Sequence, residues 1–498
     1  MTIAPRAVTV CATKKLRRKT LRKHLMLKKI QIKRWLGDIR FWIVALALIR
    51  LIGIANPPLE VSHSWRQTTV AMAARNFYEV DPNILFPRID IGGDLTGITG
   101  MEFPLLNWLI YLLSLPFGFH EWYGRLINLV VSSLGCWYFY RLLKCFFTER
   151  HAFCATLLLC VTLWFAFARK LMPDTFSMSL VIMGLYYGID YLYNEHRRVG
   201  SLIGYALLIM AGVLSKLPSG YILVVLLLPI LDKTVLLYRK VWLAVVSMLC
   251  MVPVAWWYFV WIPHLVEQYG LWHFFMGKSI SVGSAEIWHN MSRTLYRFYF
   301  NAMNYTGFAV FIAGLIVAIV KRQRLLLWLL LLAFVTFVPV MLSSGETFFK
   351  HDYYVVPFVP VMALVAGYGI SLLNTSWLRT MVLVVVAMEN ILNHHSQFVI
   401  REDRQPILAL EQSFDGFSNK DELVCINSGQ DPTVMYFTHR KGWVATNEEL
   451  QDNSYVDYLR QHRCHYILVM KKVFGSDVTL PMEKILDNEN YAIYQLAK

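Results

Sequence analysis

The chain alternates between long apolar runs and short polar or basic stretches. A membrane span needs about 20 apolar residues, and runs near that length recur from residue 41 to residue 394. We therefore expect a mainly α-helical, polytopic membrane protein. The pattern predicts eleven membrane-spanning helices, at about 41–56, 126–143, 152–169, 175–194, 201–215, 219–238, 241–262, 302–320, 325–343, 353–373 and 378–394.

A further apolar run, at 104–118, decides the orientation of the others. Lys and Arg gather in cytoplasmic loops, and basic loops lie at 141–150, 197–198, 233–240 and 321–324. These loops all face the cytoplasm only if 104–118 is a helix lying along the membrane surface. We predict this arrangement, with a cytoplasmic N-terminus and with large external loops at 57–125 and 263–300.

Composition agrees with a membrane protein. The chain is 56% hydrophobic and only 16% charged, whereas soluble domains average roughly 25% charged residues. The formal net charge of +15 is uneven, because residues 1–40 hold thirteen Lys or Arg and one Asp. We predict that 1–40 is a basic cytoplasmic tail against anionic membrane lipid. No base-reading motif or folded basic domain accompanies the tail, so we expect no nucleic-acid partner.

Residues 395–498 have a different pattern, in which short β-rich runs alternate with polar stretches. This pattern predicts a small α/β domain, and an odd number of spans places it on the external, periplasmic side. It contains no glycine-rich phosphate-binding motif. Cys425 and Cys464 both fall in this part. They are either a disulfide pair or two cysteines in adjacent core strands, and the usual burial of cysteine favours the second.

Polar residues gather in the external loops. Such groups at a membrane boundary indicate a functional site. Carboxylates and His can take a proton from an acceptor hydroxyl, whereas Lys and Arg can bind a phosphate. The loops together therefore suit chemistry on a lipid-linked phosphosugar. The candidates are Glu60, His63, Arg66, Asp90, Asp94, Glu102, Asp174, Lys216, Lys350, His351, Asp352 and Tyr353.

The order and spacing of these motifs resemble the GT-C glycosyltransferases, in particular the family 39-type branch with protein O-mannosyltransferases and the lipid A aminoarabinose transferase. In that family the first loop carries an acidic pair before Arg-Tyr, then an Ile-Ala-Arg helix, then a Glu-Lys-Pro-Pro-Leu turn. The corresponding residues here are His63-Ser64-Trp65-Arg66-Gln67, Ala73-Ala74-Arg75-Asn76 and Glu102-Phe103-Pro104-Leu105. Residues 216–218 and 351–360 are similar to two later family motifs. His63 replaces the family's acidic residue, and Phe103 replaces its Lys.

The resemblance implies transfer of a sugar from a polyprenyl-phosphate donor to a lipid, glycan or protein acceptor at the outer membrane face. The implied reaction is an in-line, inverting displacement. The base is Glu60, His63 or Glu102, three alternatives that the sequence leaves open. The implied donor-phosphate ligands are Arg66, Lys216, Lys350 and Tyr353. Secondary site candidates are Asp90, Asp94, Asp174 and His351.

Three other functions stay open. A polymerase or ligase would use polyprenyl-diphosphate glycans, and a lipid or glycan transporter would move substrate without forming a glycosidic bond. A non-catalytic scaffold would need none of the carboxylates. No metal-ligand set is assigned, because the histidines of the 263–300 loop are irregularly spaced, although a divalent metal is compatible with the residues present.

Overall fold

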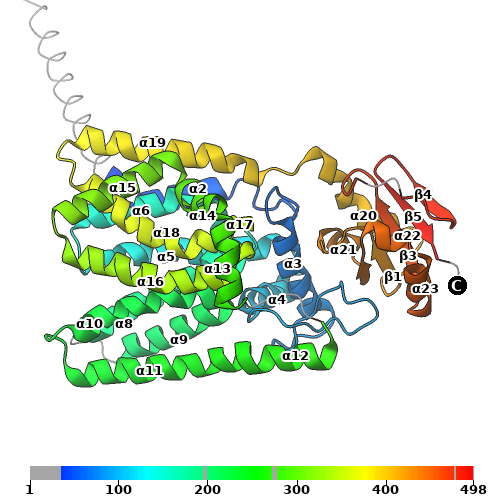
Figure 1. The fold of residues 1–498 in the computed structure, drawn as a ribbon, viewed down its shortest axis with the longest axis horizontal. Helices are drawn as coiled ribbons and strands as arrows, with labels where there is room; N and C mark the ends of the chain where they lie inside the picture. The colour runs from blue at the N-terminus through cyan, green and yellow to red at the C-terminus, as the bar shows by residue number, and fades with distance from the viewer. Residues whose placement is uncertain (1–34, 195–198, 272–276, 476–477, 497–498) are drawn as a thin grey trace, which may run out of the picture.

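The computed structural model describes residues 35–194, 199–271, 277–475 and 478–496. The predicted basic tail lies outside these residues, apart from its last six. Figure 1 shows a bundle of elongated helices with a smaller strand-containing region beyond one end. The helices of the bundle are α2 (Ile39–Arg50), α5 (Trp122–Lys144), α6 (Glu149–Val161), α7 (Leu163–Phe167), α8 (Pro173–Tyr193), α9 (Val199–Ser215), η1 (Leu217–Leu226), α10 (Leu227–Leu231), α11 (Leu237–Trp256), η2 (Trp257–Trp261), α12 (Ile262–Tyr269), α15 (Asn304–Val320), α16 (Arg324–Ser344), η4 (Asp352–Phe358), α18 (Val359–Ser371) and α19 (Ser376–His394).

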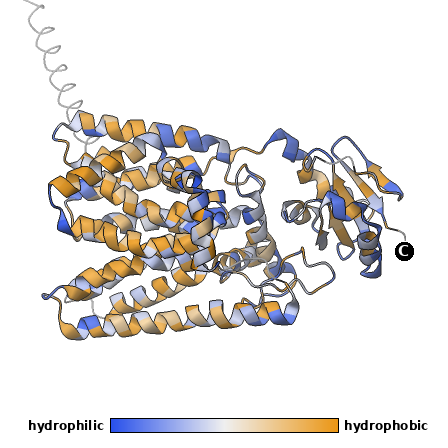
Figure 2. Cartoon of the chain, viewed as in Figure 1, coloured by the Kyte–Doolittle hydropathy of each residue, from blue (hydrophilic) through white to orange (hydrophobic). Residues whose placement is uncertain are grey.

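Short elements lie at the end of the bundle that faces the strand-containing region (Figure 1). They are α3 (Ser64–Glu79), α4 (Leu105–Phe117), α13 (Ile280–His289), α14 (Met291–Tyr296), η3 (Arg297–Ala302) and α17 (Glu346–Lys350). Helix α4 falls within the 104–118 run that we expected to be a helix of the first loop. Figure 2 shows mainly hydrophobic residues along the bundle helices and more hydrophilic ones among these short elements.

The predicted count of eleven spans is not confirmed. In the described part of the chain, four helices are long and apolar enough to cross a membrane, and a pair bent by 95° around residue 303 would be a fifth. Local breaks explain the difference. The predicted 152–169 span divides at Thr162, whose backbone is extended, and the 219–238 span is a 3₁₀ segment followed by a five-residue helix. Pro229 lacks the backbone N–H that a regular helix through this span would require.

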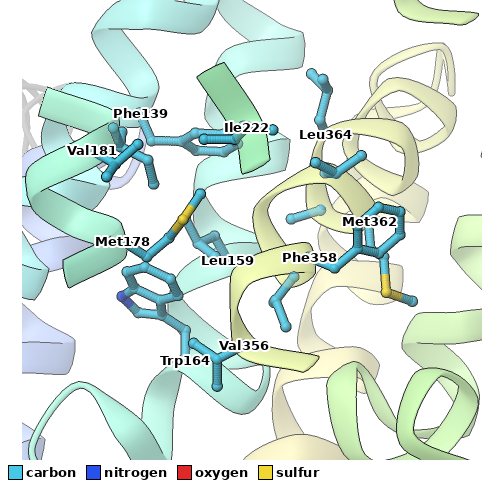
Figure 3. Close-up of a cluster of buried hydrophobic side chains, with 14 of the residues drawn as sticks. Phe139, Leu159, Trp164, Met178, Val181, Ile222, Val356, Phe358, Met362 and Leu364 are labelled. Carbon is cyan, nitrogen blue, oxygen red and sulfur yellow. The ribbon is translucent and has the colours of Figure 1, made fainter. Parts of the chain in front are cut away.

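The bundle core combines aromatic and aliphatic side chains from several helices. Figure 3 shows Phe139, Met178, Ile222 and Leu364 among them, with Trp164 below. Small residues allow close helix packing: a Cβ at Gly314 of α15 would lie 2.3 Å from the carbonyl oxygen of residue 365 in α18. Glycine is therefore needed for these two backbones to pack so closely.

The C-terminal region is a five-stranded sheet in the order β2-β1-β3-β5-β4. Strands β2, β1 and β3 are parallel, whereas β5 is antiparallel to both β3 and β4. Alternate residues of β1 and β3 enter separate apolar clusters, so the sheet is covered on both faces. The elements are η5 (His395–Phe398), η6 (Glu402–Ala409), α20 (Leu410–Asp415), β1 (Leu423–Ile426), α21 (Thr433–Thr438), β2 (Gly442–Val444), α22 (Asn447–Gln451), α23 (Asn453–Gln461), β3 (Cys464–Met470), β4 (Lys484–Asp487) and β5 (Tyr491–Gln495).

The two cysteines of this region lie in adjacent core strands. Cys425 is in β1 and Cys464 is in β3, and both thiols are free and buried. Burial raises the pKa of Cys464 to about 12, so its thiol stays protonated at neutral pH. The structure therefore agrees with the core-strand interpretation of this pair.

Candidate functional site

A cavity of about 520 Å³ lies at the end of the bundle where the short elements gather. Several separate parts of the chain form its walls: the start of α3, the 102 loop, the turn before η1, η2, the segment at Gly277, the end of α16 with α17, and the start of η4. It is therefore assembled by the fold and not by one motif. Its polar and aromatic wall residues are His63, Ser64, Trp65, Arg66, Glu102, Lys216, Tyr258, Ser343, Ser344, Thr347, His351, Tyr353 and Tyr354.

A network of alternating charges forms one wall of the cavity. Arg66 Nη2 lies 2.5 Å from Glu102 Oε1, and Lys216 Nζ lies 3.9 Å from the same oxygen and 2.7 Å from Asp174 Oδ1. Burial opposes ionisation of Glu102, but the charges of Arg66 and Lys216 outweigh it and hold the pKa of this carboxyl below its usual range. Glu102 is therefore a carboxylate that positions two cations, and a weak proton acceptor.

Aromatic rings surround the Lys216 ammonium. Its Nζ lies 4.9 Å from the ring centroid of Tyr353 and 5.7 Å from that of Tyr354, which is the range of a cation–π contact. Tyr258 also lines the cavity and donates a hydrogen bond of 2.8 Å to the carbonyl of Leu214. These rings restrict the ammonium while leaving it on the cavity wall.

His63 faces the cavity from a strained turn. Ser62 and His63 have φ values of 68° and 63°, a left-handed conformation that is costly for residues with a side chain. The His63 Nε2 atom lies 2.6 Å from Asp352 Oδ1. His351 lies beside it, with a ring-centroid separation of 6.0 Å, and burial, followed by the effect of His63, lowers the pKa of His351 to about 4. His351 is therefore neutral at pH 7.

Glu60 lies outside the cavity, contrary to the expectation that it is a candidate base. Its side chain is 0% exposed and is ion-paired with Arg169 and, at 3.2 Å, with Arg125. Arg169 also donates to the carbonyls of residues 50, 52 and 53, and Arg125 to those of residues 54, 56 and 57. The carboxylate between these two cations has a structural position and no access to an acceptor.

Three further sequence candidates also lie elsewhere. Lys350 is 55% exposed, pairs with Glu346 at 3.1 Å, and lines a different cavity beside α14. Asp90 pairs with Arg75 at 2.9 Å, and Asp94 pairs with His462 at 2.8 Å. Asp94 thus joins the first loop to the C-terminal region, whereas the Asp90–Arg75 pair lies within the first loop. Asp174 is fully buried behind Lys216 and reaches the site only through that ammonium.

Asp352 is one of the polar candidates named from the sequence, but its pairing with His63 was not predicted. The sequence feature that pointed to a paired Asp352 is the polar run His351-Asp352-Tyr353-Tyr354 directly before an apolar helix, where an unpaired carboxylate would be costly.

A second cavity, of about 300 Å³, lies between α5, α8 and α18, but aliphatic and aromatic side chains form almost all of its wall. Within the described residues, no three His, Cys, Asp or Glu side chains are grouped so that they could hold a metal ion.

Residues 102–257 match the family model described as dolichyl-phosphate-mannose-protein mannosyltransferase. No curated protein matches the chain. ArnT from Cupriavidus metallidurans in the apo state is a similar solved structure, with a TM-score of 0.60 and 14% identity, covering 91% of this chain and 97% of that chain. The chain has the GT-C fold.

Two further GT-C structures are similar. ArnT bound to undecaprenyl phosphate has a TM-score of 0.59 and 14% identity, covering 91% of this chain and 98% of that chain. The Archaeoglobus fulgidus oligosaccharyltransferase in complex with Zn and sulfate has a TM-score of 0.52 and 12% identity, covering 87% of this chain and 68% of that chain. The predicted GT-C resemblance is thus confirmed. The GT-C family match begins at Glu102 and includes Asp174 and Lys216, whereas His63 and Asp352 lie outside it.

Proposed function

We propose that this protein transfers a sugar from a polyprenyl-phosphate donor to an acceptor hydroxyl at the outer membrane face. The observation that carries the proposal is the cavity that joins Arg66 and Lys216 to a histidine and to buried carboxylates. The donor phosphodiester carries one negative charge and gains a second as the sugar leaves. Two fixed cations in a secluded cavity stabilise such developing charge. The ArnT structure with undecaprenyl phosphate supports the same ligand chemistry by analogy of fold.

The charges of the wall explain how the phosphate would be held. Arg66 and Lys216 are balanced by Glu102 and Asp174, so the cations are already oriented without a donor. A phosphate that binds here contacts the same two cations as the carboxylates do. Its binding therefore does not lose the free energy needed to fix two mobile side chains. Leu217, Pro218 and Val340 add an apolar part to the wall, which suits the lipid side of the donor.

His63 is the group that we assign as the base. Glu60 is enclosed by two guanidinium groups, and Glu102 is held ionised by two cations, so neither suits proton removal. His63 lies on the cavity wall and can accept the acceptor's hydroxyl proton in its neutral form. The acceptor oxygen then forms its bond to the anomeric carbon as the bond from that carbon to the phosphate oxygen breaks. Inversion follows from an attack in line with the departing phosphate.

The proposed orientation uses the positions of the basic loops. The turns between α10 and α11 and between α15 and α16 lie at the end of the bundle away from α3 (Figure 1). Lys233, Arg239 and Lys240 lie in or just after the first turn, and Lys321, Arg322 and Arg324 lie in or just after the second. Basic loops favour the cytoplasm. We therefore propose that the cavity and the C-terminal region lie on the external, periplasmic side, with the N-terminus in the cytoplasm.

A donor assay tests the proposed function. Purified protein in lipid nanodiscs receives a panel of radiolabelled polyprenyl-phosphate sugars, with membrane extracts as the source of acceptor, and release of polyprenyl phosphate is measured. We expect turnover with the monophosphate donor and a loss of about 10²-fold or more in Arg66→Ala. Arg88→Ala is the matched control, because Arg88 lies in the same loop but pairs with Asp81 at 2.8 Å outside the cavity.

Three outcomes would contradict the proposal. Turnover of a polyprenyl-diphosphate glycan in place of the monophosphate sugar would favour the polymerase or ligase. Movement of intact donor across the membrane without bond cleavage would favour a transporter. Equal turnover in Arg66→Ala and Arg88→Ala would remove the cavity from the reaction.

A further inference from the structure

Asp352 and His63 meet from positions 289 residues apart in the chain. The His63 side chain is 13% exposed and the Asp352 side chain 12%, and their nearest atoms are 2.6 Å apart. A carboxylate so close to one imidazole nitrogen determines the tautomer of the ring. With the proton held on Nε2, the lone pair is on Nδ1.

The turn that carries His63 is fixed at several points. The backbone N–H of Val61 donates to the carbonyl of Val399 at 2.9 Å, and the buried Lys170 Nζ donates to the carbonyl of Ser62 at 3.2 Å. The carbonyl of His63 accepts from the N–H of Gln67 at 2.9 Å. The left-handed residues 62 and 63 are therefore held in place by contacts from two distant parts of the chain and by the first hydrogen bond of α3. Backbone strain that the surroundings maintain in this way is typical of functional sites.

Aromatic side chains, as well as the carboxylate, enclose the His63 ring. Tyr353 presents its ring edge-on to His63, with centroids 5.0 Å apart. The imidazole is thus held between a carboxylate and aromatic rings, which restrict its rotation.

We propose that Asp352 is the positioning residue that sets His63 as the base of the transfer reaction. This inference rests on the proposed function. The acceptor O–H gives its proton to His63 Nδ1 as the new bond to the anomeric carbon forms. The electron pair of the broken carbon–oxygen bond leaves with the polyprenyl phosphate. The imidazolium that results is paired with the Asp352 carboxylate, and its charge offsets the second negative charge on the phosphate.

Asp352→Asn is the decisive substitution, because an amide at this place can donate to Nε2 and so move the ring proton to Nδ1. We expect kcat to fall by about 10²–10⁴-fold, while KM for the donor changes by less than about threefold. Asp352→Glu should recover part of the rate. His63→Gln combined with Asp352→Asn should be no slower than the slower single variant, because the two residues act as one unit.

Glu346→Gln is the matched control: it removes a carboxylate from the same loop, but Glu346 is 44% exposed and pairs with Lys350 outside the cavity. The protonation state is also read directly. Nitrogen-15 spectra of histidine-labelled protein, with His63 assigned from the His63→Gln difference, should show the Nε2-protonated tautomer in the wild type.

The outcomes separate the two proposals. If the wild type transfers sugar and Asp352→Asn keeps kcat within about threefold, the positioning role is wrong while the proposed function stands. If the wild type transfers nothing, the proposed function is wrong, and the spectra still decide the pairing. An Nδ1-protonated His63 in the folded wild type would overturn the inference, even if Asp352→Asn fails to fold.

Discussion

Replacing Glu60 with Gln distinguishes a structural carboxylate from a catalytic one. Glu60 is fully buried between the guanidinium groups of Arg125 and Arg169. Through these two side chains it indirectly holds the segment from residue 50 to residue 57, whose carbonyls the arginines bind. Gln keeps the size of the side chain but removes its charge. The substitution leaves two buried cations facing each other with only carbonyl dipoles around them.

The expected cost follows from this geometry. Removing one partner of a buried ion pair costs about 3–5 kcal/mol, and Glu60 serves two partners. At roughly 2 °C per kcal/mol for a large domain, the thermal midpoint should fall by about 6–10 °C. Turnover per folded molecule should change by less than about threefold, because losing a general base would cost about 10²–10⁴-fold.

Two measurements on the same samples test this prediction. The fraction that remains monodisperse after heating in detergent gives the midpoint, and polyprenyl phosphate release at a temperature below both midpoints gives the turnover. Glu346→Gln serves as the control, because exposed ion pairs contribute only about 0–1 kcal/mol. A Glu60→Gln protein with an unchanged midpoint and a 10²-fold slower reaction would refute our assignment and restore Glu60 as the base.

Three further predictions follow from other parts of the structure. Lys216→Ala should lower kcat/KM for the donor by about 10²-fold or more, whereas the exposed Lys350→Ala should stay within about threefold in the same steady-state assay. The pKa of His439 is raised by hydrogen bonds to two carboxylates, one in α20 and one in α3, so its contribution to docking is complete below about pH 6.5 and is lost as pH rises through the raised pKa. After division by the intrinsic, base-catalysed exchange rate, the protection of α21 amides should therefore fall as pH rises, and a pH-independent protection factor there would contradict this. Gly314→Val should lower the thermal midpoint, since even a Cβ would lie 2.3 Å from a carbonyl oxygen of α18, whereas Gly200→Ala, with no atom within 4 Å, should not.

The sequence predicts the helices of the bundle better than their lengths. The apolar runs at 126–143 and 325–343 correspond to α5 and α16. A helix that is buried in the bundle or that spans a membrane requires a continuous run of hydrophobic residues. The run at 104–118 corresponds to α4. The run at 219–238 does not form one helix, because Pro229 interrupts it and the segment before that proline is 3₁₀. Hydropathy records where a segment is apolar, but local backbone chemistry decides whether it is straight.

The site was predictable as a set of loops but not residue by residue. Glu60 and His63 are three positions apart and equally polar, and yet Glu60 is enclosed by arginines while His63 faces the cavity. The left-handed turn at residues 62 and 63 separates their directions, and no sequence pattern marks it, since neither residue is a glycine. The sequence also did not predict which residues pair, because Asp352 pairs with a histidine 289 positions away.

Helix α3 explains why the C-terminal sheet matters to a cavity it does not line. The helix has 16 residues and is therefore about 24 Å long. Its first turn carries Arg66. Near its other end, Arg75 donates to the carbonyl of Tyr436 at 3.1 Å, and Glu79 lies 2.9 Å from His439. A rigid helix fixed at one end cannot rotate freely at the other, so these contacts of the sheet region also constrain the direction of Arg66. The C-terminal region is in this respect part of the site's support.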